Sequence, residues 1–187
     1  MISDQKFYDR ANKFALLHST KNEFSTLEEY KEKVKDNQTD KHDKVIFLYT
    51  NNAAGHDSFV QACYNRGYDV LLFDTVIDNH YMQTLEHKDG TITFVRVDSD
   101  TVDKLVQKDE QNESVLSDEE QAKVQEAFEE VISGEGARVV MSPLSPDDVP
   151  VTITKPEFMR RMKEMQALQG MDFGGLPDTY NVVVNTN

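Results

Sequence analysis

Two apolar runs that flank one helix-length segment constrain the fold of this chain more than any other feature. The first run, Val45-Ile46-Phe47-Leu48-Tyr49, is continuous rather than alternating, which is typical of a strand covered on both faces. The second run occupies residues 68–73, and the segment between them has apolar residues at helical spacing until Gly67, which ends that helix. Because strands joined through a helix pair in parallel, the sequence predicts a parallel sheet covered by helices.

The segments on either side extend this pattern. We predict a helix at residues 75–85, then a turn at Asp89-Gly90 and a strand at 91–97 on the edge of the sheet. The first 36 residues predict two helices, because apolar residues recur at helical spacing from Phe7 to Leu17 and a capping box starts at Thr26. Residues 1–97 are therefore expected to form a small α/β/α three-layer unit with parallel strands.

Acidic residues are concentrated between positions 98 and 135, where 13 Asp or Glu accompany three lysines. The hydrophobic periodicity lapses between 98 and 116, so we expect an acidic connector there. The net charge of −14 argues against nucleic acid as a partner, because phosphates need a basic patch. One cysteine, no membrane-length apolar run and no secretion signal predict a cytoplasmic protein without membrane contact.

Residues 117–187 predict a different architecture. A second capping box at Ser117 begins a helix, and strands at 137–141 and 149–154 are expected to pair as a hairpin. A helix from 157 to about 169 and a last strand at 180–184 complete the unit. The predicted fold class is thus α/β followed by α+β, the second unit being helix–hairpin–helix–strand.

Cofactor sites have little support in the sequence. The turn after the first strand, residues 50–55, contains neither G-x-G-x-x-G nor G-K-[ST], so nucleotide binding is not expected. The five histidines are scattered without the spacing of a metal site. Cys63 falls on the apolar face of its helix, which predicts a buried thiol rather than a nucleophile. We expect neither a cofactor nor a metal in this chain.

Asp74, Asp78 and His80 follow the second apolar run, where open α/β sheets often place active sites. Two acids and a histidine could perform general acid–base chemistry if a pocket shifted their pKa values. The same residue types also suit a helix start, with Asp74 or Thr75 as the cap and Asp78 in the first turn. We prefer the capping interpretation and keep a small α/β enzyme as an alternative.

Five segments follow one another in the order of a known family's motifs. They are TLEEY at 26–30, KVIFLYT at 44–50, RGYDVLLFDTVIDN at 66–79, FMRRMKEMQA at 158–167 and VVVN at 182–185. In this order they resemble the heat shock protein 90 family of molecular chaperones, in its bacterial HtpG type. Three positions depart from the family pattern: Asn79 replaces an acid, His80 an aromatic residue and Pro143 a basic one.

The resemblance implies that the chain is one portion of a longer protein. Residues 1–97 would be the end of the middle domain, 98–116 a connector, and 117–187 most of the C-terminal domain, stopping before the helices through which the family dimerises. The ATPase domain, with its ATP and magnesium, would lie outside this portion. The parent would be a homodimer that remodels non-native client proteins, and this chain alone is expected to be a monomer or a weak dimer.

The predicted helix at 157–169 is the expected client contact. Phe158, Met162, Met165 and Leu168 fall on one side of it, with Met159 toward the edge. We assign Phe158 and Leu168 to the core. Unbranched thioether side chains adapt to irregular apolar surfaces, which suits the binding of many unfolded segments. The candidate client-binding residues are therefore Met159, Met162 and Met165, together with His80 and Tyr81.

A third interpretation remains open beside the chaperone portion and the enzyme. The acidic stretch at 98–135 could be a protein-interaction module, although such a charge run is more often a solvated surface.

Overall fold

The computed structural model describes residues 6, 10–75, 77–108, 112–132, 136–168 and 179–187, without the side chains of 164–168. The chain divides into two compact units. Unit 1 comprises residues 1–97 and 104–108, and unit 2 comprises residues 98–103 and 109–187. The predicted fold class is confirmed: a parallel sheet with helices is followed by a unit of mixed strands and helices.

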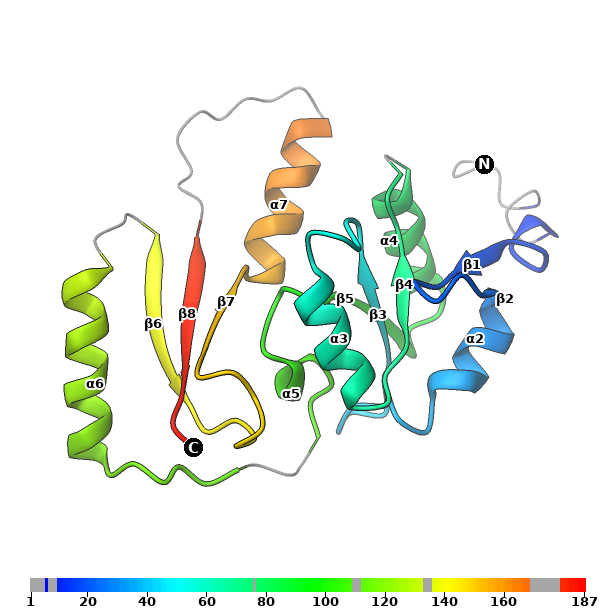
Figure 1. Ribbon diagram of the computed structural model, residues 1–187. Helices are drawn as coiled ribbons and strands as arrows, with labels where there is room; N and C mark the ends of the chain where they lie inside the picture. Colours follow the sequence, from blue (N-terminus) through cyan, green and yellow to red (C-terminus); the bar gives the residue numbers. More distant parts are fainter. Residues whose placement is uncertain (1–5, 7–9, 76, 109–111, 133–135, 169–178) are drawn as a thin grey trace. The chain divides into compact units, whose positions relative to one another are not determined.

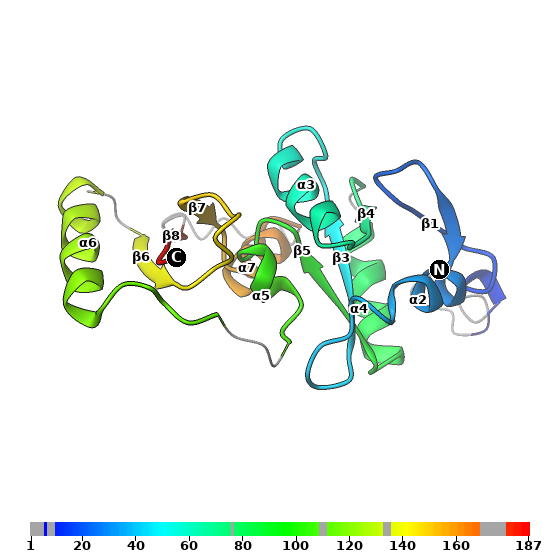
Figure 2. The same cartoon turned by 60° about the horizontal axis from the view of Figure 1, so that its bottom comes forward.

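Unit 1 is built on a parallel sheet of three strands. β3 (Val45–Thr50) lies in the centre, between β4 (Val70–Leu72) and β5 (Ile92–Arg96), and both neighbours run parallel to it. The crossovers are α3 (Asp57–Asn65) and α4 (Asp78–Lys88), which cover opposite faces of the sheet (Figures 1 and 2). The predicted parallel sheet and the edge position of its last strand are confirmed.

Burial on both faces explains the continuous apolar run in β3. Alternate side chains of a strand point to opposite faces, and all six residues of β3 are buried. On one face, Phe47 packs edge-on against Tyr30 and Phe94, with ring centroids 4.9 Å and 5.3 Å apart. Ile46 and Leu48 alternate with Phe47 along the strand and so point to the other face, where both are buried.

The N-terminal region contains strands where the sequence predicted a helix reaching Leu17. β1 (Leu16–His18) and β2 (Phe24–Thr26) form an antiparallel hairpin that leads into α2 (Leu27–Val34). Just beyond β1, the backbone N–H of Thr20 donates to the carbonyl of Val70 at 2.8 Å. Pairing with the outer edge of β4 therefore overrides the helical spacing of this segment. Phe7 lies outside the described residues.

Both predicted capping boxes are present. At α2, Thr26 and Glu29 exchange hydrogen bonds between side chain and backbone. At α6 (Asp118–Val131), the backbone N–H and the hydroxyl of Ser117 donate to the Glu120 carboxylate at 2.9 Å and 2.8 Å. These bonds, the backbone one foremost, lower the pKa of Glu120 below its ordinary value of 4.5.

This pKa shift predicts that the start of α6 loosens in acid. Because the folded-state pKa of Glu120 is depressed, its capping contribution is complete above the ordinary value and is lost as the pH falls through the folded-state pKa. An NMR titration should show the Ser117 amide and the Glu120 carboxyl shifting together, at a pH below 4.5. In a Glu120→Gln variant the Ser117 amide should lose this titration step, and a step that persists would contradict the assignment.

The expected connector is packed over its first part. Asp98, Ser99 and Thr101 are buried, and α5 (Val102–Leu105) follows them directly. Its apolar side chains are also buried, as is the next residue, Val106. A single amphipathic turn is too short to stand out among acidic neighbours, so the sequence suggested a solvated segment from residue 98 onward. The division into chaperone-type domains stays a prediction.

Unit 2 contains a mixed sheet in place of the predicted hairpin. β6 (Ala137–Ser142) and β7 (Val151–Thr154) do not pair with each other, because β8 (Tyr180–Asn185) lies between them. β8 runs parallel to β6 and antiparallel to β7. Its three consecutive valines, 182–184, are all buried, and a strand buried on both faces belongs in the centre of a sheet.

The loop between β6 and β7 is held by β8 rather than by a tight turn. The Asn185 side chain accepts from the backbone N–H of Leu144 at 3.0 Å and donates to the carbonyl of Ser145 at 2.9 Å. Leu144 is buried. The loop thus passes the end of β8 and connects one edge of the sheet to the other. This crossing explains why the hairpin prediction was wrong.

α6 follows the edge of this sheet beside β6 (Figure 1). No residue of the helix is fully buried: Val124 and Phe128 are half-buried, and Val131 is 81% exposed. The apolar residues of this helix are therefore not buried as a complete stripe. Contact with a single edge of the sheet covers only part of that stripe.

Candidate functional site

The acids after β4 form a helix start. Asp78 is the first residue of α4, and its carboxylate accepts from both the backbone N–H and the hydroxyl of Thr75, each at 2.7 Å. Asp74 and His80 are exposed. Asp78 lies in the first turn of α4, as predicted, and its hydrogen bonds account for its position without any chemistry. The prediction of Asp74 or Thr75 as the cap is wrong, because Ile77 occupies the cap position and makes no side-chain cap bond.

His80 and Tyr81, two of the candidate client-binding residues, differ in their surroundings. Tyr81 is half-buried against the core of unit 1, and its hydroxyl donates to the Asn12 side chain at 2.9 Å. The side chain of His80 is exposed, and its backbone carbonyl accepts from the Thr84 hydroxyl at 2.7 Å. Of this pair, His80 presents its side chain to solvent, whereas Tyr81 connects α4 to the N-terminal region.

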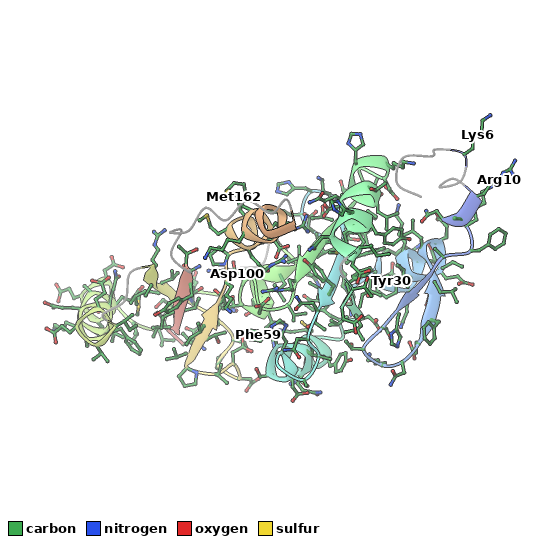
Figure 3. All side chains as sticks on the ribbon, turned by 90° about the horizontal axis from the view of Figure 1, so that it is seen from above. Lys6, Arg10, Tyr30, Phe59, Asp100 and Met162 are labelled. Atoms are coloured by element: carbon green, nitrogen blue, oxygen red, sulfur yellow. The ribbon has the colours of Figure 1, made fainter. Side chains whose placement is uncertain are left out.

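The remaining candidates lie on α7 (Glu157–Leu168) in unit 2. Met159 and Met162 are half-buried, and Figure 3 shows Met162 on this helix. The side chains of Met165 and Leu168 lie outside the described residues. Phe158 is 74% exposed, so its assignment to the core is wrong. The described part of α7 therefore presents one exposed aromatic ring and two half-buried thioether side chains.

An ion-pair cluster holds the first turn of α7. Glu157 accepts from Arg160 and, at 2.6 Å, from Arg161. An acid in the first turn also complements the helix dipole. Both arginines fold back toward Glu157, so their charges lie near the start of the helix. Phe158 is the residue that directly follows Glu157.

Further exposed apolar residues lie on β7 and just before it, which sequence reasoning missed. Val151 and Ile153 of β7 are exposed, as is Val149 just before the strand, whereas Thr154 at the end of β7 is fully buried. The signal in the sequence was the alternating run Val-Thr-Ile-Thr, which indicates a strand with one β-branched face turned outward. We read that run as half of a hairpin, which would have covered its edge.

A buried ionic cluster in unit 1 was also missed. The Asp69 carboxylate is almost inaccessible and lies 2.8 Å from the Lys33 ammonium, which also contacts Glu23 at 2.6 Å. Burial and the nearby Asp69 charge raise the pKa of the Tyr30 hydroxyl well above its ordinary value. This cluster connects α2, the β1–β2 hairpin and the start of β4, so we interpret it as structural.

Other chemistry finds little support in the described part of the chain. Cys63 is buried, and burial raises its pKa to about 12, so the thiol stays protonated at neutral pH. No group of three or more His, Cys, Asp or Glu among the described residues could hold a metal ion. None of the described helices has the length and apolar character required to cross a bilayer.

Comparison with known proteins decides the family. The family model described as Hsp90 protein matches residues 1–176. The chain belongs to the Hsp90 family. The resemblance inferred from the motif order is thereby confirmed.

Relatives in the Hsp90 family carry the name chaperone protein HtpG. The protein from Bacteroides thetaiotaomicron is 40% identical over 192 aligned positions, and that from Porphyromonas gingivalis is 41% identical. Each alignment covers 100% of this chain but 28% of the relative, so the chain spans less than a third of their length. A solved middle domain of a Plasmodium falciparum heat shock protein aligns with 53% of this chain and 41% of its own, at 16% identity and a TM-score of 0.40, too slight a likeness to carry an argument.

Proposed function

We propose that this chain is a portion of an ATP-dependent molecular chaperone of the HtpG type that binds and remodels non-native client proteins. The portion supplies client-contacting and structural surface and catalyses no reaction itself. ATP and magnesium belong to another domain of the parent, which works as a cytoplasmic homodimer. Membership of the Hsp90 family and the HtpG name of the relatives support this proposal.

The observation that carries the client-binding part is the exposure on α7. Phe158 is mostly exposed and Met159 and Met162 are half-buried, although all three are apolar. Contiguous apolar surface exposed to solvent is what marks protein–protein contact sites, and these three residues are close together on one helix. The Glu157 ion pairs hold the backbone of this turn, while flexible thioether side chains adapt to different segments.

Replacing both Met159 and Met162 by Gln should weaken client binding at modest cost in stability. Because both side chains are half-buried, we expect the double substitution to lower the free energy of unfolding by about 1–2 kcal/mol. Replacing a single fully buried methionine by Ala lowers it by about 2–5 kcal/mol. We expect at least a fivefold weaker affinity for reduced, unfolded α-lactalbumin, measured by fluorescence anisotropy.

The matched control replaces the same two residues by Leu. This change keeps the volume and the apolar surface, so binding should stay within twofold of the original chain. If the Gln variant binds unfolded α-lactalbumin as tightly as the original chain, α7 is not the client contact. If the Gln variant unfolds, the two methionines are core residues and the assignment fails.

A second function is supported by α6. This helix buries none of its residues and carries three acids in its first turn, which fits an acidic module that contacts a basic partner. Such binding would weaken steeply with salt, because exposed charges are screened, whereas apolar binding at α7 would not. The enzyme alternative has no comparable support, since both carboxylate oxygens of Asp78 accept hydrogen bonds from Thr75.

A further inference from the structure

The outer edge of β7 has backbone groups to which no other described residue is hydrogen-bonded. The backbone N–H of Asn185 in β8 donates to the carbonyl of Pro150 at 2.8 Å. In an antiparallel pair, alternate residues direct their backbone groups to the partner strand. The register therefore turns Pro150, Thr152 and Thr154 toward β8, and it turns the N–H and carbonyl groups of Val151 and Ile153 away from the sheet.

This open edge is short and well bounded. At its C-terminal end, the backbone N–H of Lys155 donates to the carbonyl of Asp98 at 2.8 Å, so that position is occupied. β7 is an edge strand in the described part of unit 2, and no hydrogen bond within that part occupies the outward groups of Val151 and Ile153. Their side chains are 38% and 56% exposed.

We propose that an extended segment of a non-native polypeptide adds to β7 as a fourth strand, next to Val151 and Ile153. The inference rests on the proposed chaperone function and gives it a binding mode. Main-chain hydrogen bonds supply recognition that does not depend on the client's sequence. The exposed β-branched side chains add a preference for apolar residues at alternate positions of the client.

The charge of the chain favours this occupant over a second copy. With a net charge of −14, two copies repel each other as they approach. The same charge attracts a segment that carries Lys or Arg beside its apolar residues. The short open edge makes each contact weak and readily reversible, and the exposed Phe158 on α7 lies only a few residues further along the chain.

The test uses a variant and a modified peptide. The probe is a fluorescein-labelled peptide, Lys-Val-Thr-Val-Thr-Val-Lys, and its affinity is measured by fluorescence anisotropy. Ile153→Pro removes the outward N–H but none of the bonds to β8, a position where an edge strand tolerates proline. We expect at least tenfold weaker binding of the peptide to this variant. A peptide N-methylated at alternate residues should lose affinity for the unchanged chain to a similar extent.

The control is Ile153→Thr, which keeps the backbone donor and a β-branched side chain, and binding should weaken by threefold or less. The N-methylated peptide leaves the protein intact, so it decides the question even if the proline variant unfolds. Equal affinity for the plain and the N-methylated peptide would overturn strand addition.

Two further outcomes separate the possible failures. If unfolded α-lactalbumin binds but the peptide result is negative, only strand addition fails. If neither probe binds the unchanged chain, the proposed client-binding function fails with it. A concentration-dependent dimer that Ile153→Pro abolishes would show a second copy on this edge and would also overturn the proposal.

Discussion

Replacing Phe47 by Ala lowers the free energy of unfolding of unit 1 by about 3–5 kcal/mol. The Phe47 ring is 0% exposed and stands in the central strand, in edge-on contact with the rings of Tyr30 and Phe94. Its removal takes away the transfer free energy of a large side chain and leaves a cavity between a strand and a helix. Such a loss is a large part of the stability of an ordinary domain.

Denaturant unfolding followed by tyrosine fluorescence measures the loss, and hydrogen exchange with mass spectrometry locates it. Protection should fall throughout β3, β4 and β5 and persist in β8, since β8 belongs to the other compact unit. The matched control is Phe14→Ala, where the ring is 81% exposed and the change should stay within about 0.5 kcal/mol. Equal losses for the two variants would contradict the packing of unit 1.

Replacing Leu105 by Ala should destabilise unit 1 by about 2–5 kcal/mol, because its side chain is buried. Leu105 lies inside the range that the charge pattern assigned to a connector, so the two interpretations differ most here. A solvated connector would tolerate the change within about 0.5 kcal/mol. The backbone N–H of Lys41 donates to the carbonyl of Gln107 at 2.7 Å, which adds a hydrogen bond between this segment and unit 1.

The comparison variant is Leu16→Ala, the same chemical change at a position exposed on β1. Urea unfolding of the two variants in parallel provides the measurement. If the urea midpoint of Leu105→Ala equals that of Leu16→Ala, residues 104–106 are not packed in unit 1 and belong to a solvated connector.

The sequence predicted most of unit 1 because its signals were local. A continuous apolar run, a capping box and a glycine stop each act within a few residues of the chain. The N-terminal hairpin was not predictable in this way, because β1 exists through pairing near Val70, far along the chain. The same limit applies to β8, whose position between β6 and β7 depends on strands that precede it by many residues.

The candidate site was predictable in part. Helical spacing placed Met159 and Met162 on one helix, and both turned out to be half-buried. Phe158 was assigned to the core because an aromatic residue usually is buried, yet the extent of burial depends on what packs against a helix and not on its own pattern. The open edge of β7 was missed because the sequence was read as a hairpin. Strand pairing decides which backbone groups are left without a partner strand, and that pairing was predicted wrongly.

The position of β8 also affects the order in which the two sheets can assemble during synthesis. In unit 1 the central strand, β3, is made before β4 and β5, so each later strand finds a partner as it emerges. In unit 2 both edge strands are made first and must wait until residues 180–185 leave the ribosome. Until then β6 and β7 have no strand between them, and their apolar residues are open to other chains. A nascent chain of this chaperone family thus passes through a stage in which it is itself a candidate for protection by a chaperone.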